Sequence, residues 1–301
     1  VNMGKVNNKG FEVTARWEDQ IQNVRYHIGT NWGYAKNEIV FNDEIPQPYE
    51  WMRRTGRPVG QQFGYMYDGF FTEEEAANYA SLKGKEGGIP DHGEGFTPLA
   101  GDVKYKDISG PDGVPDGVID DYDKTNIGSP MPKFTFGWTN TFRYKNFDLS
   151  VFINGSYGNK VYNYLSMKLT HMNSPWTNQL NAVNGRAQLV PINPNKVYED
   201  GTMWYNDVSN VMVANPGASI PRATINDPND NDRISDRYIE DGSYIRLKNI
   251  SLGYTFPKKT IDKLGLSNLR IYANIQNLLT ITGYDGYDPE IGASTSSVNV
   301  Y

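Results

Sequence analysis

The fold is decided by residues 128–163, GSPMPKFTFGWTNTFRYKNFDLSVFINGSYGNKVYN. Large apolar side chains alternate there with small or polar ones, and the alternation restarts after Lys145 and Asn146. The apolar positions are Phe134, Phe136, Trp138, Phe142 and Tyr144, then Phe147, Leu149, Val151 and Ile153. Period-two alternation on both sides of a two-residue turn predicts a long antiparallel hairpin with one apolar face. A transmembrane β-barrel requires strands of this length and pattern.

Four further segments alternate in the same way and bring the predicted strands to six. They are Phe11–Trp17, Val24–Tyr34, Ser243–Phe256 and Leu269–Gln276, with Asn7–Gly10 predicted to be turn residues before the first. Within Ser243–Phe256 the parity changes, because Ile245 and Leu247 are out of step with Ile250 and Leu252. A β-bulge near Lys248 and Asn249 would restore the register. Alternatively, one end of this strand faces protein instead of lipid.

The connections between these strands fall into two length classes that alternate strictly. Residues 19–23, 145–146 and 257–267 are short connections, whereas residues 35–133 and 158–242 are very long. Outer-membrane barrels have tight periplasmic turns and extended external loops. A soluble β-sandwich or jelly roll gives no physical reason for such a separation. The pattern therefore predicts an all-β antiparallel membrane barrel with long outer loops at about 35–133 and 158–242.

The composition excludes several other classes of protein. No apolar run approaches the roughly 18 residues that a transmembrane helix needs, and 38% of residues are hydrophobic. The 21 Tyr, 12 Phe and 6 Trp suit the aromatic girdles of a barrel, or equally the core of a soluble all-β protein. The absence of Cys excludes disulfides. A net charge of −6 without a basic run argues against a nucleic-acid partner.

Six strands are too few for a closed barrel, since single-chain bacterial barrels begin at about eight strands. An open sheet edge is not tolerated in lipid. We therefore expect the chain to be the C-terminal part of a larger barrel.

Three stretches resemble the SusC/RagA family of TonB-dependent outer-membrane transporters. They are VNMGKVNNKGFEVTARW (1–17), residues 101–163, and SDRYIEDGSYIRLKNISLGYTFPKKTIDKLGLSNLRIYANIQNLLTITGYDGYDPEIG (235–292). The resemblance covers essentially the whole chain. It implies the C-terminal segment, residues 1–301, of a barrel of about 22 strands. The plug domain and the upstream barrel would lie outside this chain.

The resemblance also implies a location and a set of partners. The protein would lie in the Gram-negative outer membrane, in contact with its lipid, and import nutrients, either an oligosaccharide or a peptide. A SusD-like surface lipoprotein would cover the mouth as a lid, and TonB would act through the missing N-terminal region. The alternative from another class is a secreted, soluble all-β carbohydrate-binding or adhesion protein. Only the importer should require detergent to leave the membrane.

An acidic loop, DISGPDGVPDGVIDDYD (107–123), carries the candidate metal ligands. Closely spaced Asp residues with Gly between them are typical of loops that wrap calcium. The candidate ligands are Asp107, Asp112, Asp116, Asp120 and Asp123. A register beginning at Asp112 leaves its third position to Val114, which has no side-chain oxygen. A register beginning at Asp107 needs residues 111–115 as an insertion.

The loop therefore leaves two interpretations open. It either holds a structural calcium ion, or it is a solvated turn in which the carboxylates cap their own backbone. No cofactor is required in either case.

No catalytic constellation is present in the sequence. His27, His92 and His171 are scattered, and there is no G-x-S-x-G motif, P-loop or Cys nucleophile. The carboxylates of Glu73–Glu75 open a predicted short helix, with Thr72 as N-cap and Glu75 closing a capping box. We expect the protein not to be an enzyme.

Aromatic residues in the long loops are the candidates for contact with substrate or lid: Trp51, Trp176, Tyr198, Trp204 and Tyr205. Exposed aromatic rings offer a large rigid contact area at low entropy cost. Alternatively, they pack the loops against themselves. The polar strand face carries Arg16, Arg25, Arg143, Arg270 and Asn274, which we expect to line a lumen and contact a plug.

Overall fold

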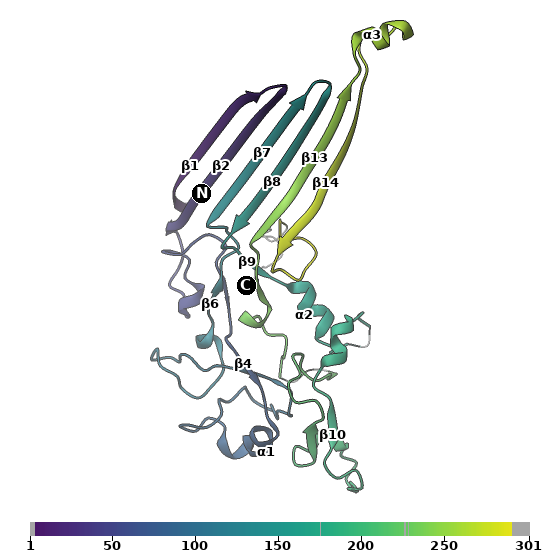
Figure 1. The fold of residues 1–301 in the computed structure, drawn as a ribbon. Coiled ribbons are helices and arrows are strands. Elements are labelled where there is room, and N and C mark those ends of the chain that lie inside the picture. Colours follow the sequence, from purple (N-terminus) through teal and green to yellow (C-terminus); the bar gives the residue numbers. More distant parts are fainter. Residues whose placement is uncertain (1–3, 175, 226, 228, 291–301) are drawn as a thin grey trace.

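Six long antiparallel strands form one sheet in chain order (Figure 1). The computed structural model describes residues 4–174, 176–225, 227 and 229–290. The strands of the sheet are β1 (Gly4–Ile21), β2 (Val24–Asn42), β7 (Phe134–Tyr144), β8 (Phe147–Tyr157), β13 (Tyr244–Thr255) and β14 (Arg270–Thr282). The prediction that the six alternating segments form one antiparallel sheet is confirmed. None of the helices in the described residues has the length and apolar character needed to cross a membrane.

The predicted apolar positions share one face of the sheet. Directly paired residues lie on the same face, and Trp138 pairs with Ile153 while Phe142 pairs with Leu149. The ladder between β2 and β7 extends this face, with Tyr26 opposite Phe142. The other face is mostly polar. Sequence parity therefore predicted correctly which side chains lie together.

A β-bulge restores the register of β13, as the first of the two interpretations predicted. The pairing shifts between Leu247 and Asn249 on both sides of the strand. Because of this shift Leu247 lies opposite Ile153, and Ile250 lies opposite Val151. Both halves of β13 thus contribute to the same apolar face.

The prediction of a turn at Asn7–Gly10 was wrong. These residues lie inside β1, where Asn7 pairs with Glu38 and Gly10 pairs with Ala35. A Cβ at Gly10 would lie 2.1 Å from the Tyr34 carbonyl oxygen, so glycine permits a close backbone approach here. Continuous backbone pairing outweighs the turn preference of the Asn side chains. Because β2 extends to Asn42, the first long connection begins at residue 43. Because β13 begins at Tyr244, the second long connection ends at residue 243.

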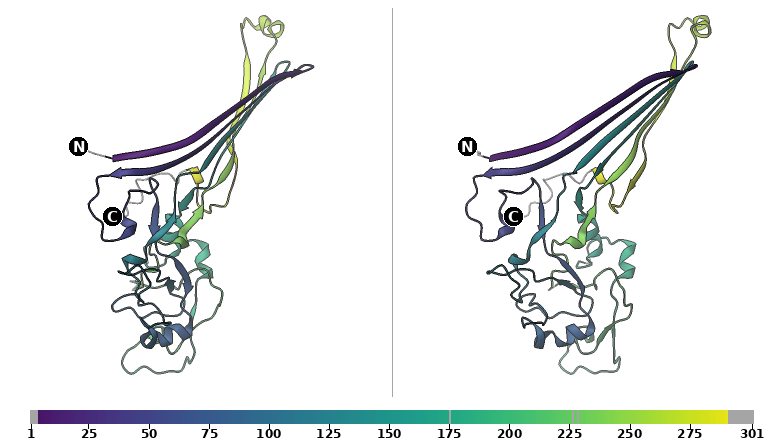
Figure 2. Two further views of the ribbon diagram at one scale, coloured as in Figure 1. Left: turned by 90° about the vertical axis from the view of Figure 1, so that its left-hand side faces the viewer. Right: turned by 60° about the vertical axis from the view of Figure 1, so that its left-hand side comes forward.

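The two long connections fold together into a separate loop body at one end of the sheet (Figures 1 and 2). In the first lie η1 (Glu50–Met52), β3 (Gln62–Gly64), β4 (Tyr67–Phe70), α1 (Glu73–Leu82), β5 (Val103–Tyr105), η2 (Asp121–Asp123) and β6 (Thr125–Gly128). In the second lie β9 (Lys160–Tyr162), α2 (Tyr164–Thr170), η3 (Asn181–Gly185), β10 (Leu189–Pro191), η4 (Trp204–Asn206), β11 (Val211–Val213), η5 (Asp236–Tyr238) and β12 (Ile239–Asp241). The pairs β3–β6, β4–β5, β9–β12 and β10–β11 form small sheets.

The loop body has its own apolar core and its own polar core. Phe71, Tyr79 and Phe96 pack together as buried rings. Buried polar bonds join the two connections, since Asn231 Oδ1 accepts a hydrogen bond from the Val103 backbone N–H at 2.7 Å. Helix α1 begins with the predicted capping box between Thr72 and Glu75. The loops are therefore packed structure instead of solvated chain.

The opposite end of the sheet carries only short turns. Two of them have two residues each, and the third holds α3 (Lys258–Ile261) and η6 (Asp262–Leu264), which project beyond the other turns (Figure 1). The sheet therefore has one end of tight turns and one end of long folded connections.

Candidate functional site

Asp123 organises the acidic loop through its own carboxylate. Its Oδ1 accepts hydrogen bonds from the backbone N–H groups of Ile108 and Ser109 at 2.7 and 3.2 Å, and its Oδ2 accepts from Asp120 N at 2.8 Å. The Asp123 side chain is fully buried. Burial raises the pKa of this carboxyl to about 6, although the backbone bonds act in the opposite direction. Asp123 thus closes the loop from inside.

The other predicted ligands mostly accept backbone bonds as well. Asp107 Oδ2 accepts from Gly117 N at 2.5 Å, Asp116 Oδ1 from Val118 N at 3.0 Å, and Asp120 Oδ1 from Tyr122 N at 2.7 Å. Asp112 is exposed. Within the described residues, the acidic loop does not bring three ligand atoms within 4.8 Å of one another. The geometry is that of a turn whose carboxylates bond to their own backbone.

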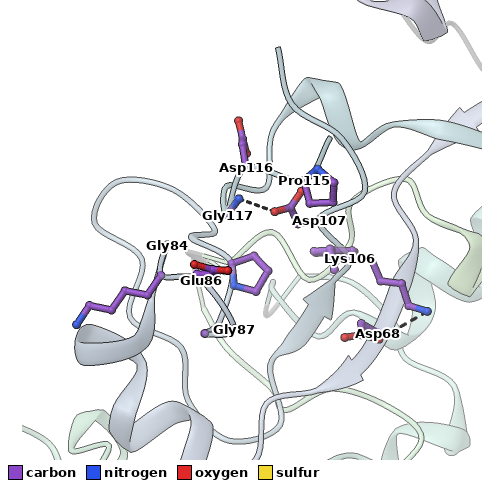
Figure 3. A pocket seen from close by; sticks show the side chains of 13 residues that line it. Asp68, Gly84, Glu86, Gly87, Lys106, Asp107, Pro115, Asp116 and Gly117 are labelled. Carbon is purple, nitrogen blue, oxygen red and sulfur yellow. Dashed lines mark hydrogen bonds and ion pairs between the residues drawn. The ribbon is translucent and has the colours of Figure 1, made fainter. Parts of the chain in front are cut away.

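A hollow of about 620 Å³ lies beside this loop (Figure 3). Glycines Gly84, Gly87 and Gly117 contribute to its walls, together with charged side chains. Figure 3 shows Asp107 directed at Gly117, whereas Asp116 points away from the other carboxylates. The hollow is therefore polar, with its acidic groups spread around it.

Trp51 is not available for a surface contact, so this candidate was wrong. Only 5% of its surface is exposed, and its Nε1–H donates to the Asp121 carbonyl oxygen at 2.8 Å. The Lys124 ammonium lies 4.6 Å from the ring centre. Trp51 packs the loop body against itself, as the alternative interpretation predicted. In contrast, 92% of Trp176 is exposed.

The three remaining aromatic candidates lie in one lobe, formed by β10, η4, β11 and the chain between them. The rings of Trp204 and Tyr205 are 5.7 Å apart. The Tyr198 hydroxyl donates to Asp207 Oδ2 at 2.9 Å and accepts from Asn210 Nδ2 at 2.9 Å. Several apolar side chains of this β10–β11 lobe are exposed: Ile192, Val197, Met203, Tyr205 and Met212. Apolar side chains gathered on one exposed lobe are typical of an interaction surface.

A buried ion cluster was missed in the sequence. His171 Nε2 lies 2.5 Å from Asp227 Oδ2, and its Nδ1 lies 2.9 Å from Asp232 Oδ2. Burial disfavours the charged ring, but the bonds to the two carboxylates prevail and raise the pKa of His171 to about 9. Because each ring nitrogen faces a carboxylate, the arrangement suits an imidazolium ion better than a metal ligand. The signal available was the run of Asp and Asn at residues 227–232.

The chain is similar to curated TonB-dependent receptors over almost its whole length. It is 31% identical to TonB-dependent receptor P3 and 28% identical to TonB-dependent receptor P26, both of Formosa agariphila, over 96% of this chain in each case. It is 30% identical to TonB-dependent receptor SusC of Bacteroides thetaiotaomicron over 58% of this chain. The chain spans about a quarter of the length of the two Formosa receptors (26% of each) and 14% of SusC.

Solved structures show the same fold. The RagAB peptide transporter matches 96% of this chain with a TM-score of 0.59 and 17% identity, over 27% of the RagAB chain. The closed-closed state of the RagAB importer gives the same TM-score at 18% identity. No protein-family model matches the chain. On the sequence similarity to named receptors and the shared fold, the chain belongs to the SusC/RagA family of TonB-dependent receptors.

Proposed function

We propose that the chain forms barrel wall and outer loops of a TonB-dependent importer in the Gram-negative outer membrane. The observation that carries this proposal is the sheet, whose six strands share one apolar face and have their long connections at a single end. An apolar outer face and long external loops are the marks of outer-membrane barrels. The names of the sequence relatives support import over the alternative of a soluble binding protein.

The finer features of this proposal follow the resemblance. Residues 1–301 are the C-terminal part of a closed barrel of about 22 strands, with the plug and the upstream strands outside the chain. The face with Phe136, Trp138 and Val151 contacts lipid, and the loop body faces outward. Upstream, TonB pulls on the plug to open the passage. The chain performs no chemistry of its own, and the nutrient is an oligosaccharide or a peptide.

A SusD-like lipoprotein is the proposed partner at the outer surface. The RagAB structures are named as a peptide transporter and importer. The β10–β11 lobe and Trp176 expose apolar and aromatic side chains on the loop body. Exposed aromatic anchors of this kind carry much of the energy in protein interfaces. We place the lid, or the substrate that it delivers, against Trp176, Trp204 and Tyr205, with Tyr198 supporting the lobe from within.

Protease treatment of intact cells tests location, orientation and lid together. If the loop body faces outward, protease should cut at the exposed Trp176 or in the β10–β11 lobe, and leave the turn at Lys145 intact. Co-expression of the SusD-like lipoprotein should then reduce cleavage in the β10–β11 lobe. Cleavage at Lys145 alone would show that the short turns, and not the loop body, face outward. Recovery of the chain in buffer without detergent would contradict the membrane location.

Calcium is proposed as an optional structural occupant of the acidic loop. Asp107 Oδ1 is buried and, among the described residues, has no hydrogen-bond partner, which leaves one oxygen for a cation. The backbone bonds of the other carboxylates, however, already stabilise the turn, so no function is assigned to the ion.

Replacing Asp116 by alanine should loosen this loop without disrupting the sheet. The change removes one bond to the Val118 N–H at an exposed position, worth about 0.5–1.5 kcal/mol. Hydrogen exchange of residues 107–123 should increase in the variant while that of β7 and β8 stays constant. Adding calcium to the parent protein should slow exchange there only if the ion binds. Equal hydrogen exchange in variant and parent, with and without calcium, would contradict both the calcium site and the turn stabilised by its own carboxylates.

A further inference from the structure

The α3–η6 turn, residues 257–266, projects beyond the other short turns of the sheet (Figure 1). Its charged residues are three lysines and one aspartate: Lys258, Lys259, Lys263 and Asp262. Within the described residues, none of the three lysines has a carboxylate within 4.0 Å. The side chains of Leu264 and Leu266 are 68% and 42% exposed. The turn therefore presents cationic groups and apolar groups side by side at its surface.

Backbone hydrogen bonds fix the shape of this turn. The Ile261 carbonyl oxygen accepts from Leu266 N at 3.2 Å, and the Asp262 carbonyl oxygen accepts from Gly265 N at 3.1 Å. Gly265 has a φ of 68°, a left-handed conformation that glycine adopts without strain. Ile261 is buried inside the turn. Because the backbone closes around Ile261, Leu264 and Leu266 stay at the surface.

Aromatic rings gather on the apolar face of the sheet directly before this turn. Phe147 lies opposite both Tyr144 and Tyr254, and the ring centres of Phe147 and Tyr254 are 4.6 Å apart. The Phe256 ring lies 5.0 Å from that of Tyr254, and Phe256 N donates to the Leu269 carbonyl oxygen at 2.9 Å. Such aromatic bands lie at the headgroup level of membrane proteins. The α3–η6 turn thus begins at the end of the apolar face.

We propose that the α3–η6 turn is a docking site for anionic phospholipid headgroups of the periplasmic leaflet. A cluster of lysines just beyond an aromatic band lies at the depth of the lipid phosphates, and clustered basic side chains are attracted to an anionic surface. The exposed leucines supply the apolar contact with which such segments enter the headgroup layer. The inference rests on the proposed function, because it takes the apolar face as the face toward lipid.

The side chains of the turn favour lipid over a periplasmic protein as the occupant. Lysine is depleted in the core of protein interfaces, and leucine is under-represented among the residues that carry most of the binding energy. Lysine beside leucine is instead the composition of segments that lie on anionic membranes. The turn is also continuous with the apolar face through Phe256 and Leu269.

Photocrosslinking of the full-length protein tests this inference. The protein is purified in detergent and reconstituted into vesicles of phosphatidylcholine with a minor share of phosphatidylglycerol. A benzophenone side chain replaces Leu264, whose exposed position accommodates it. Mass spectrometry of the digested product gives the ratio of the two lipids among the adducts. Phosphatidylglycerol should exceed its share of the vesicle several-fold at position 264. The same side chain in place of Leu252, which pairs with Leu149 on the apolar face, should report the lipid ratio of the bilayer.

Charge variants test whether the lysines cause this enrichment. Replacing Lys258, Lys259 and Lys263 together by glutamine should return the ratio at position 264 to that of the bilayer. The enrichment should also fall several-fold between about 0.1 and 1 M salt, since the screening length shrinks from about 10 to about 3 Å. A matched control removes three exposed lysines at the other end of the sheet and should leave the ratio at position 264 unchanged: Lys5→Gln, Lys9→Gln and Lys36→Gln.

Enrichment at position 264 that depends on the three lysines supports the proposal. Lipid adducts at position 252 with none at position 264, or the same lipid ratio at both positions, would overturn the inference and leave the proposed function intact. Enrichment that persists in the triple glutamine variant, or crosslinking of position 264 to a protein instead of lipid in intact cells, would also overturn it. An absence of lipid adducts at both positions would contradict the lipid face, and with it both the proposed function and the inference.

Discussion

Replacing Val151 by arginine is expected to destabilise the membrane-inserted sheet by about 2–4 kcal/mol, because a charge near the bilayer midplane on the lipid face of a barrel costs that much. Val151 lies near the middle of β8 and opposite Ile250 of β13, on the predicted lipid face. The folded fraction can be measured by urea titration of the full-length protein in lipid vesicles. The variant should unfold at a lower urea concentration and assemble poorly in cells.

The adjacent position provides a matched control for this prediction. Ser150 points to the opposite face, where it pairs with Thr141 and Ser251. Ser150→Arg adds the same charge at the same depth, but toward a polar interior, and should cost much less. An equal loss in both variants would show that the effect comes from the strand itself. A larger loss of stability in Ser150→Arg than in Val151→Arg would show that the face with Ser150, and not the face with Val151, contacts lipid.

The sheet could be predicted from sequence because its determinants are local. Period-two parity identifies the shared face of Phe136, Trp138 and Leu149 without knowledge of the partners. The parity change in β13 located the irregularity near Lys248, but it left open whether a bulge or a change of environment caused it, and only the pairing with β8 and β14 shows the bulge. Asn7–Gly10 could not be assigned correctly, since the pairing of β1 with β2 decides their conformation and no local signal reports it.

The loop body was less predictable because its contacts join distant segments. Trp51 is buried by residues near Asp121, and His171 meets carboxylates more than fifty positions along the chain. The composition shows that the loops are rich in aromatic and acidic residues, but it does not show which of these side chains contact one another in the folded loops. The capping box at Thr72 was correct for the opposite reason, since its two partners are three residues apart.

The buried ion cluster of His171 makes a second strong prediction. Asp227→Ala should destabilise the loop body by about 3–5 kcal/mol, because the buried Nε2–H of His171 and two N–H groups of Asn231 lose their acceptor, at about 1–3 kcal/mol each. Asp227 also accepts bonds from the backbone and side chain of Asn231 at 2.6 and 2.8 Å. Hydrogen exchange of residues 164–172 and 229–233 should rise strongly, while the exchange of β7 and β8 stays low. His27→Gln, on the sheet, is the control and should leave the loop body unchanged.

The same cluster sets the pH range in which the loop body is stable. The folded pKa of His171, about 9, is raised above its ordinary 6.5, so its stabilising effect is complete below pH 6.5 and is lost as the pH rises through 9. The loss is about 3 kcal/mol for a rise of this size. The bond to His171 lowers the pKa of Asp232 below 3.8, so that contribution is present above pH 3.8 and is lost as the pH falls further. Exchange protection of residues 164–172 should therefore be highest near pH 5–6 and weaken toward pH 9, after correction for the intrinsic exchange rate. Protection that is equal at pH 6 and pH 9.5, or a pH dependence that is unchanged in His171→Gln, would show that the imidazolium does not hold these segments together.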